Sequence, residues 1–400
     1  MIPNNAVFNA STSFHKPECV FEAVLKAMHQ AGNSGRGISG EAMEASRLIF
    51  DTRCRIARMF EADGPECVAF TGNATEALNT ALFGIIHPER ENIHAIATEM
   101  DHNSVLRPLY ALEKRGMKLT ILPADRKGRI SLTDLETAIR PETKVIVCTH
   151  ASNLIGNRND IHAIGEIAKR HKLFFIVDAA QTAGVFPISM KRDQIDILCF
   201  SGHKGLMGPQ GTGVICVRPG VRVEPLKVGG SGILTFQKEH PSDMPETLEA
   251  GTLNSHGIAG LRAALGWIEE TGTDRIRQRE QMLMQQFYDQ VKDISGVTVY
   301  GDFSQKDRSP VVTLNIGDMG SSEVSMILDE EYGISTRSGG HCAPLMHRAL
   351  GTAKTGAVRF SFSYFNTEEE VDEAARAVKE IAEETRLPKR EDVRDVSEDL

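Results

Sequence analysis

One lysine of this sequence is well placed for covalent chemistry. Lys204 lies in the segment Ser201-Gly-His-Lys-Gly205, directly after the apolar residues 195–200. A lysine at the end of a buried strand loses solvation, which lowers its pKa and lets the neutral amine form a Schiff base with a carbonyl compound. The alternative is an ordinary surface lysine in a flexible loop. The glycines at 208, 211 and 213 would also let backbone approach a ligand closely.

A second candidate lies where a predicted strand turns through glycine into a helix. In Thr71-Gly-Asn-Ala-Thr-Glu76, the free N–H groups and the positive dipole of the helix start favour an anion such as phosphate. Threonine and asparagine before a helix are also ordinary caps, so both interpretations stay open at this point. The sequence contains no G-x-x-x-x-G-K-[ST] segment, which argues against a Walker loop.

An acid and an imidazole follow two further predicted strands. Asp178 comes directly after the apolar residues 173–177, and a buried acid needs a cationic partner. His102 follows residues 93–98 and supplies a flat ring able to stack. Together the four segments offer a phosphate cradle, an acid for a pyridine nitrogen, an imine-forming lysine and a stacking ring. Pyridoxal phosphate (PLP) requires this set of groups from a protein.

The elements that must position these residues alternate between strand and helix. Apolar or β-branched runs predict strands at 68–70, 93–97, 118–122, 144–149, 173–177, 195–200 and 213–217. Helical spacing of apolar residues predicts helices near 45–60, 74–86, 103–114, 131–139 and 160–171. This order predicts an α/β fold with a mainly parallel, doubly wound sheet, in which ligands bind beyond the carboxyl ends of the strands.

The pattern changes after residue 254. Two long helices, 257–270 and 274–293, lead into strands at 297–300, 311–316 and 358–362, with further helices starting at 321 and 367. We therefore predict a large PLP-binding domain over 17–255 and a smaller α+β domain over 256–386. Residues 1–16 are predicted to form an N-terminal arm, and residues 387–400 a charged, disordered tail.

Composition excludes several classes of protein. Of the 400 residues, 41% are apolar, which suffices for a sizeable core and argues against intrinsic disorder. The net charge of −9, without a basic tract, argues against nucleic acid or an anionic membrane surface as a partner. Seven scattered cysteines without a C-x-x-C pair, and a start without a secretory signal pattern, predict reduced thiols in a soluble cytoplasmic protein.

The sequence resembles the class V aminotransferase family of fold-type I PLP enzymes, and within it the cysteine desulfurase and selenocysteine lyase branch. The motifs behind this resemblance run through almost the whole chain: FNASTSFHKP, GNATEALN, EMDHNSV, THASNLIG, VDAAQTAG, FSGHKGLMGPQGTG, EAGTLN, RSGGHCAPLMH and VRFSFSYFNT. The resemblance implies the PLP-dependent transferase fold, an obligate homodimer and a place at the active-site entrance for the N-terminal arm of residues 1–16.

The resemblance also implies roles in the cofactor site. Lys204 would hold PLP covalently, Asp178 would pair with the pyridinium nitrogen, and His102 would stack on the ring. Gln181 would bond the phenolic oxygen. The phosphate would be held by a group of small and polar residues, namely Ala74, Thr75, Ser201 and His203, together with Thr252 lent to the neighbouring subunit.

A substrate site and a nucleophile follow from the same resemblance. Arg359 would bind the substrate α-carboxylate bidentately, assisted by Asn153. Cys342 would attack the sulfur of L-cysteine as a thiolate, so His341 or Arg337 beside it would lower its pKa. A small buried apolar role is the usual one for a cysteine, but the neighbouring Gly-Gly-His favours the nucleophile.

The chain departs from the usual motifs at three positions. Phe8 stands where an acid usually precedes Asn-Ala, and Ser11 replaces a usual alanine, which puts the choice of substrate in doubt. Gly340 stands where better-known members often carry a second histidine, so the surroundings of Cys342 differ. No metal is expected, because a structural zinc site usually has four ligands and the cluster here offers three, His341, Cys342 and His347.

The leading hypothesis is a PLP-dependent cysteine desulfurase, a sulfur transferase that converts L-cysteine to L-alanine and holds the sulfur as a persulfide on Cys342 for an acceptor protein. Alternatives at this point are a selenocysteine lyase or related carbon–sulfur lyase acting on a modified cysteine, and a class V aminotransferase or epimerase that leaves Cys342 idle. A further alternative is a PLP-bound sulfur carrier or assembly partner with little turnover alone.

Overall fold

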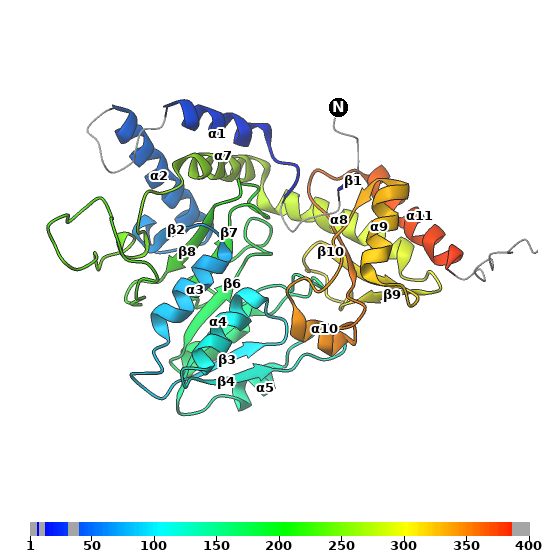
Figure 1. Cartoon of the computed structure of the whole chain (residues 1–400), viewed down its shortest axis with the longest axis horizontal. Coiled ribbons are helices and arrows are strands. Elements are labelled where there is room, and N and C mark those ends of the chain that lie inside the picture. The colour runs from blue at the N-terminus through cyan, green and yellow to red at the C-terminus, as the bar shows by residue number, and fades with distance from the viewer. Residues whose placement is uncertain (1–5, 8–12, 31–39, 386–400) are drawn as a thin grey trace, which may run out of the picture.

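The computed structural model describes residues 6–7, 13–30 and 40–385. It combines a large mixed sheet with a smaller antiparallel sheet beside it, and helices pack on both (Figure 1). The tail proposed for 387–400 and the motif departures at Phe8 and Ser11 lie outside the described residues.

The large sheet has seven strands within the described chain, in the order β2-β8-β7-β6-β5-β3-β4. Strand β8 is antiparallel to both of its neighbours, and the other neighbouring pairs are parallel. The strands are β2 (Val68–Thr71), β3 (His94–Thr98), β4 (Lys118–Leu122), β5 (Thr143–Thr149), β6 (Phe174–Asp178), β7 (Ile197–Ser201) and β8 (Gly213–Val217). Each predicted strand corresponds to one of these, so the prediction of a mainly parallel α/β sheet is confirmed.

Helices cover both faces of this sheet because alternate strand residues point to opposite sides. In β6, Phe175 and Val177 join one core, whereas Ile176 joins the other. The first core also contains residues of α2 (Gly40–Met59), α5 (Leu132–Thr137) and α6 (Ile161–Arg170), and the second those of α3 (Ala74–Ile85) and α4 (Asn103–Glu113). Two short 3₁₀ helices complete this part of the chain: η1 (Pro65–Cys67) directly precedes β2, and η2 (Glu246–Leu248) lies between β8 and α7.

Helix α7 (Ser255–Thr271) packs on the first core and lies along α1 (Glu18–Gln30) (Figure 1). Helix α7 begins at Ser255, at the predicted boundary between the two domains. Because its apolar residues join the first core, it packs with the large sheet and not with the chain that follows it. The predicted domain boundaries stay predictions. The boundary between 255 and 256 falls at the start of α7.

The smaller sheet has the order β12-β10-β9 and is antiparallel: β9 (Val297–Tyr300), β10 (Val311–Ile316) and β12 (Val358–Ser361). In β12, Val358 and Phe360 join a core shared with α8 (Thr273–Val291), α9 (Ser321–Tyr332) and α11 (Glu368–Glu384). Strand alternation therefore directs Arg359 and Ser361 to the opposite face. Strand β11 (Ile334–Ser335) pairs in parallel with β1 (Ala6–Val7), and α10 (Pro344–Leu350) follows it.

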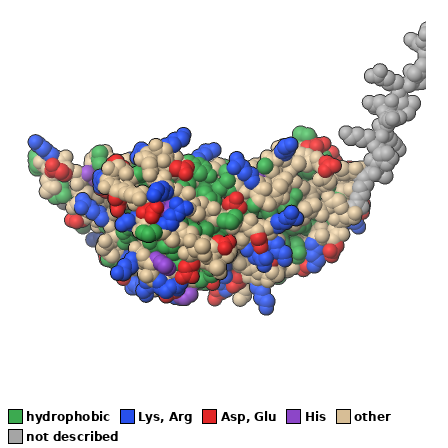
Figure 2. Space-filling view, turned by 90° about the horizontal axis from the view of Figure 1, so that it is seen from below, with side chains coloured by type: hydrophobic (Ala, Val, Ile, Leu, Met, Phe, Trp, Pro, Cys, Tyr) green, Lys and Arg blue, Asp and Glu red, His purple; other side chains and the backbone are tan. Residues whose placement is uncertain are grey.

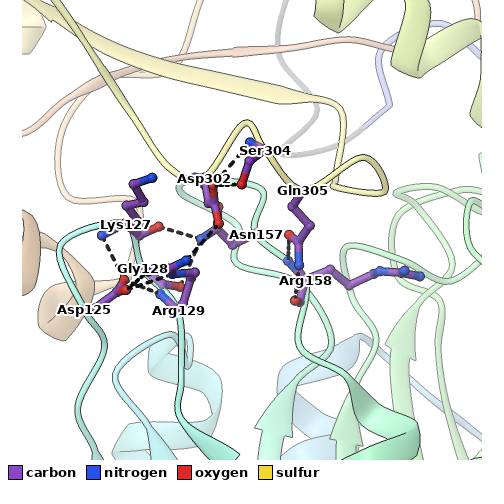
Figure 3. Close-up of polar contacts among 9 residues, drawn as sticks. All are labelled: Asp125, Lys127, Gly128, Arg129, Asn157, Arg158, Asp302, Ser304 and Gln305. Carbon is purple, nitrogen blue, oxygen red and sulfur yellow. Dashed lines mark hydrogen bonds and ion pairs between the residues drawn. The ribbon is translucent and has the colours of Figure 1, made fainter.

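The loop after β5 joins the large sheet to the smaller one (Figure 3). The Asn157 side chain donates to the carbonyls of Lys127 and Gly128 at 2.6 and 3.0 Å and accepts from Asp302 N at 2.9 Å. Gln305 exchanges two hydrogen bonds with the backbone of Arg158, both 2.8 Å. The two parts are therefore held by buried polar contacts as well as by apolar packing.

Gly156 lets this loop lie directly against the smaller part. Its φ of +75° is in the left-handed region, and a Cβ there would lie 2.7 Å from Ser309 O. Ser309 N donates to Gly156 O at 2.8 Å, and Thr313 Oγ1 donates to Leu154 O. Residues 154–157 thus form hydrogen bonds to the chain just before β10 and to the side chain of Thr313 in that strand.

Among residues 13–30 and 40–385, no helix combines the length and the apolar character needed to cross a membrane. The face seen from below carries Lys and Arg side chains interspersed with Asp and Glu (Figure 2).

Replacing Asn157 should loosen the joint between the two parts. Asn157→Ala removes three hydrogen bonds and leaves the buried Asp302 N–H without its acceptor, which should cost about 1–3 kcal/mol of unfolding free energy. Chemical denaturation followed by circular dichroism measures this. The control is Gln290→Ala, whose exposed side chain bonds Asp372 and whose loss should cost less than about 0.5 kcal/mol. Equal stability of both variants would contradict the role of Asn157.

Candidate active site

One pocket at the carboxyl ends of the strands gathers candidate residues from separate elements. Parallel strands end at the same edge of a sheet, and residues beyond those ends meet there. The pocket is lined by Ala74 and Thr75 of α3, His102 before α4, Asn153 after β5, Asp178 and Gln181 at the end of β6, and Ser201, His203 and Lys204 at the end of β7. The structure therefore brings together nearly all of the residues proposed for a cofactor.

Lys204 and Asp178 form the charged centre of this pocket. Burial lowers the pKa of Lys204 to about 8, with Arg359 and Arg337 adding to the effect and Asp178 opposing it. Burial raises the pKa of Asp178, while the Ala180 N–H, which donates to Asp178 Oδ1 at 2.9 Å, and Lys204 lower it. The lysine is the cationic neighbour that the sequence predicted for this acid, and its amine loses its proton more easily than an exposed one.

His102 is a neutral ring fixed in direction by Ser104. His102 caps α4, and its Nδ1 accepts from Ser104 N at 3.1 Å, so the ring proton is on Nε2. Burial lowers the pKa of His102 to about 4, and the charge of Lys204 contributes. An uncharged ring of fixed orientation can stack on a planar ligand.

The first turn of α3 combines a helix cap with neighbouring hydroxyl groups. Asn73 caps the helix by accepting from Glu76 N at 3.0 Å, so the capping interpretation is confirmed. Ala74 N donates to Ser201 Oγ at 3.0 Å, and Thr75 Oγ1 lies 2.7 Å from Ser104 Oγ. Hydroxyls and a helix start thus lie together at one end of the pocket.

Arg359 is a buried cation without an anionic partner in the described part of the chain. Its Nη1 donates to Asn153 O at 2.6 Å, but its Nε and Nη2 are buried without a hydrogen-bond partner among these residues, as is Asn153 Oδ1. Burial lowers the pKa of Arg359 to about 9, with Arg337 contributing. A buried charge of this kind is costly unless an anion pairs with it, so the arrangement favours a carboxylate ligand.

Cys342 lies on a short loop held between the two parts. Its carbonyl accepts from Asn103 N at 2.8 Å, and Gly339 N donates to Ser321 Oγ at 3.2 Å. His341 and Cys342 have φ values of +51° and +55°, a strained conformation for residues with side chains. All seven cysteines are described, and Cys342 alone among them is exposed.

The structure has room for a side chain at position 340. A Cβ added there would meet nothing within 4 Å, so glycine is not required by space. This position can accept the histidine that better-known members often carry, and the departure leaves the Cys342 loop open on that side.

The two candidate positive charges beside Cys342, His341 and Arg337, differ in the structure. Burial lowers the pKa of His341 to about 3, with the nearby charge of Arg359 contributing, so its imidazole is neutral near pH 7. Its Nε2 donates to Arg337 O at 3.1 Å. His341 therefore supplies no positive charge to a thiolate, and Arg337 is the cation that remains beside the loop.

Thr252 does not reach this pocket within its own chain. It is exposed and lines a different hollow with Gly72, Glu76 and Lys227, on the outer side of the first turn of α3. Among the described residues, no group of three or more His, Cys, Asp and Glu side chains is arranged to hold a metal ion.

Sequence reasoning missed two residues of this region. Ser104 bonds both His102 and Thr75. Its position two residues after His102 could have identified it from the sequence. Glu280 is a buried acid on the apolar stripe formed by Ile276, Leu283 and Phe287 of α8, and an acid on such a stripe was its signal.

Comparisons with known proteins agree with this geometry. The Aminotransferase class-V family model matches residues 6–374. The chain belongs to the class V aminotransferase family. Among similar family members, a probable cysteine desulfurase of Methanothermobacter thermautotrophicus is 32% identical over 388 residues, 96% of either chain.

Solved structures of the same kind superpose over most of the chain. The apo structure of a cysteine desulfurase from Thermococcus onnurineus is 32% identical, with a TM-score of 0.89 and 95% of both chains covered. A cysteine desulfurase from Escherichia coli is 26% identical, with a TM-score of 0.84 and the same coverage. These likenesses confirm the fold class and the family resemblance drawn from the sequence motifs.

The amine of Lys204 in this class V family member should become reactive at lower pH than an exposed lysine. Only the neutral amine is methylated reductively, so labelling of Lys204 in cofactor-free protein should rise with a midpoint near pH 8. Mass spectrometry of the labelled peptides measures this midpoint. Lys292, whose pKa is raised by Asp289, is the control within the same sample and should respond at higher pH.

Asp178→Asn tests the cause of this shift. Removing the carboxylate removes the charge that favours the ammonium form, so the Lys204 midpoint should fall further. A midpoint for Lys204 equal to that of Lys292 would contradict the assigned environment.

Proposed function

We propose that this chain is a PLP-dependent cysteine desulfurase, which converts L-cysteine to L-alanine and transfers the sulfur to Cys342. One observation carries the proposal. A lysine of lowered pKa, an acid and a neutral ring line one pocket, and a buried arginine without an anion in the described chain bonds to Asn153 of its lining. An exposed cysteine, Cys342, lies on a loop nearby. The named cysteine desulfurases that the chain resembles support it.

The pocket residues fit PLP by their chemistry. Lys204 would bond the cofactor covalently, Asp178 would pair with the ring nitrogen, His102 would stack, and Gln181 would bond the phenolic oxygen. The buried Asp178 suits a protonated ring nitrogen, because a cation next to it offsets its burial. When bound, PLP withdraws electrons from the α-carbon of an amino acid. The phosphate would be held by Ala74, Thr75, Ser201 and His203.

The unpaired atoms of Arg359 and Asn153 fit an amino-acid substrate. The two free guanidinium nitrogens, Nε and Nη2, can donate to the two oxygens of an α-carboxylate. Asn153 holds Arg359 in place through its carbonyl, and Arg337 adds a second positive charge. The substrate would therefore be bound by its carboxylate end and turned with its side chain toward Cys342.

Cys342 would act on the substrate sulfur. Its thiolate forms the S–S bond while the bond between the substrate β-carbon and sulfur breaks. The carbon keeps that electron pair and takes up a proton, which leaves alanine and a Cys342 persulfide. Exposure of Cys342 allows a protein acceptor to approach, and the reducing cytoplasm expected from the scattered cysteines would keep its thiol free.

The purified holoenzyme tests the function directly. With L-cysteine and a reductant it should form equal amounts of alanine and sulfide, and Cys342→Ser should form neither above a background rate while keeping the absorbance of bound PLP. Amino-acid analysis and a sulfide assay measure the products. The control is Cys54→Ser, which replaces a half-buried cysteine of α2 and should leave both products unchanged. Undiminished sulfide from Cys342→Ser would contradict the persulfide mechanism.

We also propose that two copies of the chain form a homodimer. The loop after β8 projects from the end of the large sheet and exposes apolar side chains, with Val228 71% exposed and Phe236 fully exposed (Figure 1). Gly251 N donates to Gly230 O at 2.8 Å, so this loop is tied to the segment of Thr252. Exposed apolar side chains next to a residue with no role in its own pocket favour a surface that a second copy covers.

Charges placed on this loop should separate the copies. The wild-type protein should be a dimer by size-exclusion chromatography with light scattering, and the double variant Val228→Asp with Phe236→Asp should shift to monomer, because an interface cannot bury unpaired carboxylates cheaply. Met326→Asp is the control, since its side chain is 52% exposed on α9 of the smaller part. A monomeric wild type, or a dimeric double variant, would contradict the proposal.

A further inference from the structure

A second cavity reaches Lys204 from between the two parts of the molecule. Lys204 and Gln181 line it on one side, and Ser309 and Ser361 of the smaller part line it on the other, with Glu280 of α8. About 60 Å³ of it is open to water-sized molecules, which is room for roughly four waters at about 15 Å³ each. Lys204 and Gln181 also line the proposed cofactor pocket, so the two spaces meet at the lysine.

Three buried oxygens of this cavity have no partner in the described part of the chain: Glu280 Oε2, Ser309 Oγ and Ser361 Oγ. Their residues are only 4%, 1% and 1% exposed. A buried polar atom without a partner costs about 1–3 kcal/mol, and buried waters usually satisfy such atoms when the space is polar and large enough. The walls of this cavity are largely apolar, but the three oxygens together with Lys204 and Gln181 offer partners to ordered waters, so the cavity can hold a short chain of them.

The fold explains why these oxygens converge. Ser361 follows Arg359 by two residues on the same face of β12, roughly 7 Å along the strand. Ser309 precedes β10, which pairs with β12. Ser361 thus lines the cavity from the strand face that also carries Arg359, and the cavity extends from there to Lys204.

Glu280 is the titratable group at the far end. Its Oε1 accepts from Tyr364 N at 3.2 Å. Burial raises the pKa of Glu280 to about 8 and lowers that of Lys204 to about 8, so the two groups bind and release a proton in the same pH range. His15 also lines the cavity, while the neighbouring Arg279 bonds Glu368 and Asn366 O.

We propose that Glu280, Ser309 and Ser361 hold a chain of buried waters that carries protons between the Glu280 carboxyl and Lys204 Nζ. The Glu280 O–H bond breaks and its proton passes to the adjacent water, each water passes one proton on, and neutral Nζ takes the last. The electron pair stays on Glu280 as carboxylate, and the reverse transfer restores the carboxyl. Glu280 is thus a positioning residue that acts through Lys204.

This inference rests on the proposed function and has a consequence specific to it. Lys204 is the base that would take the proton from the substrate α-carbon. If that proton passes into the water chain, it mixes with other protons before alanine forms. Without the chain, the same proton returns to the product.

An isotope experiment on the holoenzyme tests this consequence. Wild-type enzyme turning over α-deuterated L-cysteine in ordinary water should give alanine with little deuterium, measured by mass spectrometry. Glu280→Gln keeps the shape but holds no acidic proton, and Glu280→Leu removes the polar end, so both should give a several-fold rise in deuterium retained. Arg279→Gln, one residue away on α8, is the control and should retain as little as the wild type.

Two outcomes would overturn the proposal. Wild-type alanine that keeps most of its deuterium would show that Lys204 is isolated from other protons. Variants at Glu280 that lose turnover but retain no more deuterium than wild type would show a purely structural role.

A measurement without turnover separates this proposal from the function itself. Infrared difference spectra of cofactor-free wild type and Glu280→Gln should show a protonated carboxyl at neutral pH, and a crystal structure should show waters bonded to Glu280 Oε2, Ser309 Oγ and Ser361 Oγ. An ionised Glu280 or a dry cavity would overturn the proton chain. Failure to form alanine from L-cysteine would instead overturn the proposed function, whatever the cavity contains.

Discussion

The contact between the loop after β5 and the smaller sheet is the constraint on which the site depends. Asn153 supplies the carbonyl that holds Arg359, and three residues later Gly156 accepts the Ser309 N–H that fixes the start of β10. The same run of backbone thus positions the arginine and aligns the strand beside it. Asn157 then extends this contact to the loops at Gly128 and Asp302 (Figure 3). The site is divided between the large and the smaller sheet, and it keeps its geometry because one loop is hydrogen-bonded to both.

The site is electrostatically incomplete by itself. Lys204, Arg337 and Arg359 are close enough for each arginine to lower the pKa of Lys204, while Asp178 is the anion that opposes them. Each additional buried positive charge increases the free energy of the empty protein. Anions bound at the helix start of α3 and at Arg359 would reduce this cost.

Much of the fold could be predicted from the sequence. Apolar runs such as 173–177 located the strands, and the residues that follow the parallel strands β6 and β7, including Asp178 and Lys204, lie at one edge of the sheet. The short pair β1–β11 and the seven-residue helix α10 were not predicted, since two to seven residues give too little periodicity to identify. The sequence left His341 and Arg337 open as the cation beside Cys342, because the neutrality of His341 results from burial and from Arg359, which is eighteen residues further along the chain.

What the sequence determined by itself is local: hydrophobic periodicity defines strands and helices, and the chemistry of Lys204 or Cys342 is a property of the side chain. Only the tertiary structure decided which of these groups are buried and which remain unpaired. Strand alternation points Arg359 and Ser361 to one face, but desolvation and the absence of partners arise when β12 packs against the loop at Asn153. Solvation depends on every neighbour in space, so pKa values and unsatisfied atoms, including Glu280 Oε2, follow from packing and cannot be assigned from sequence order.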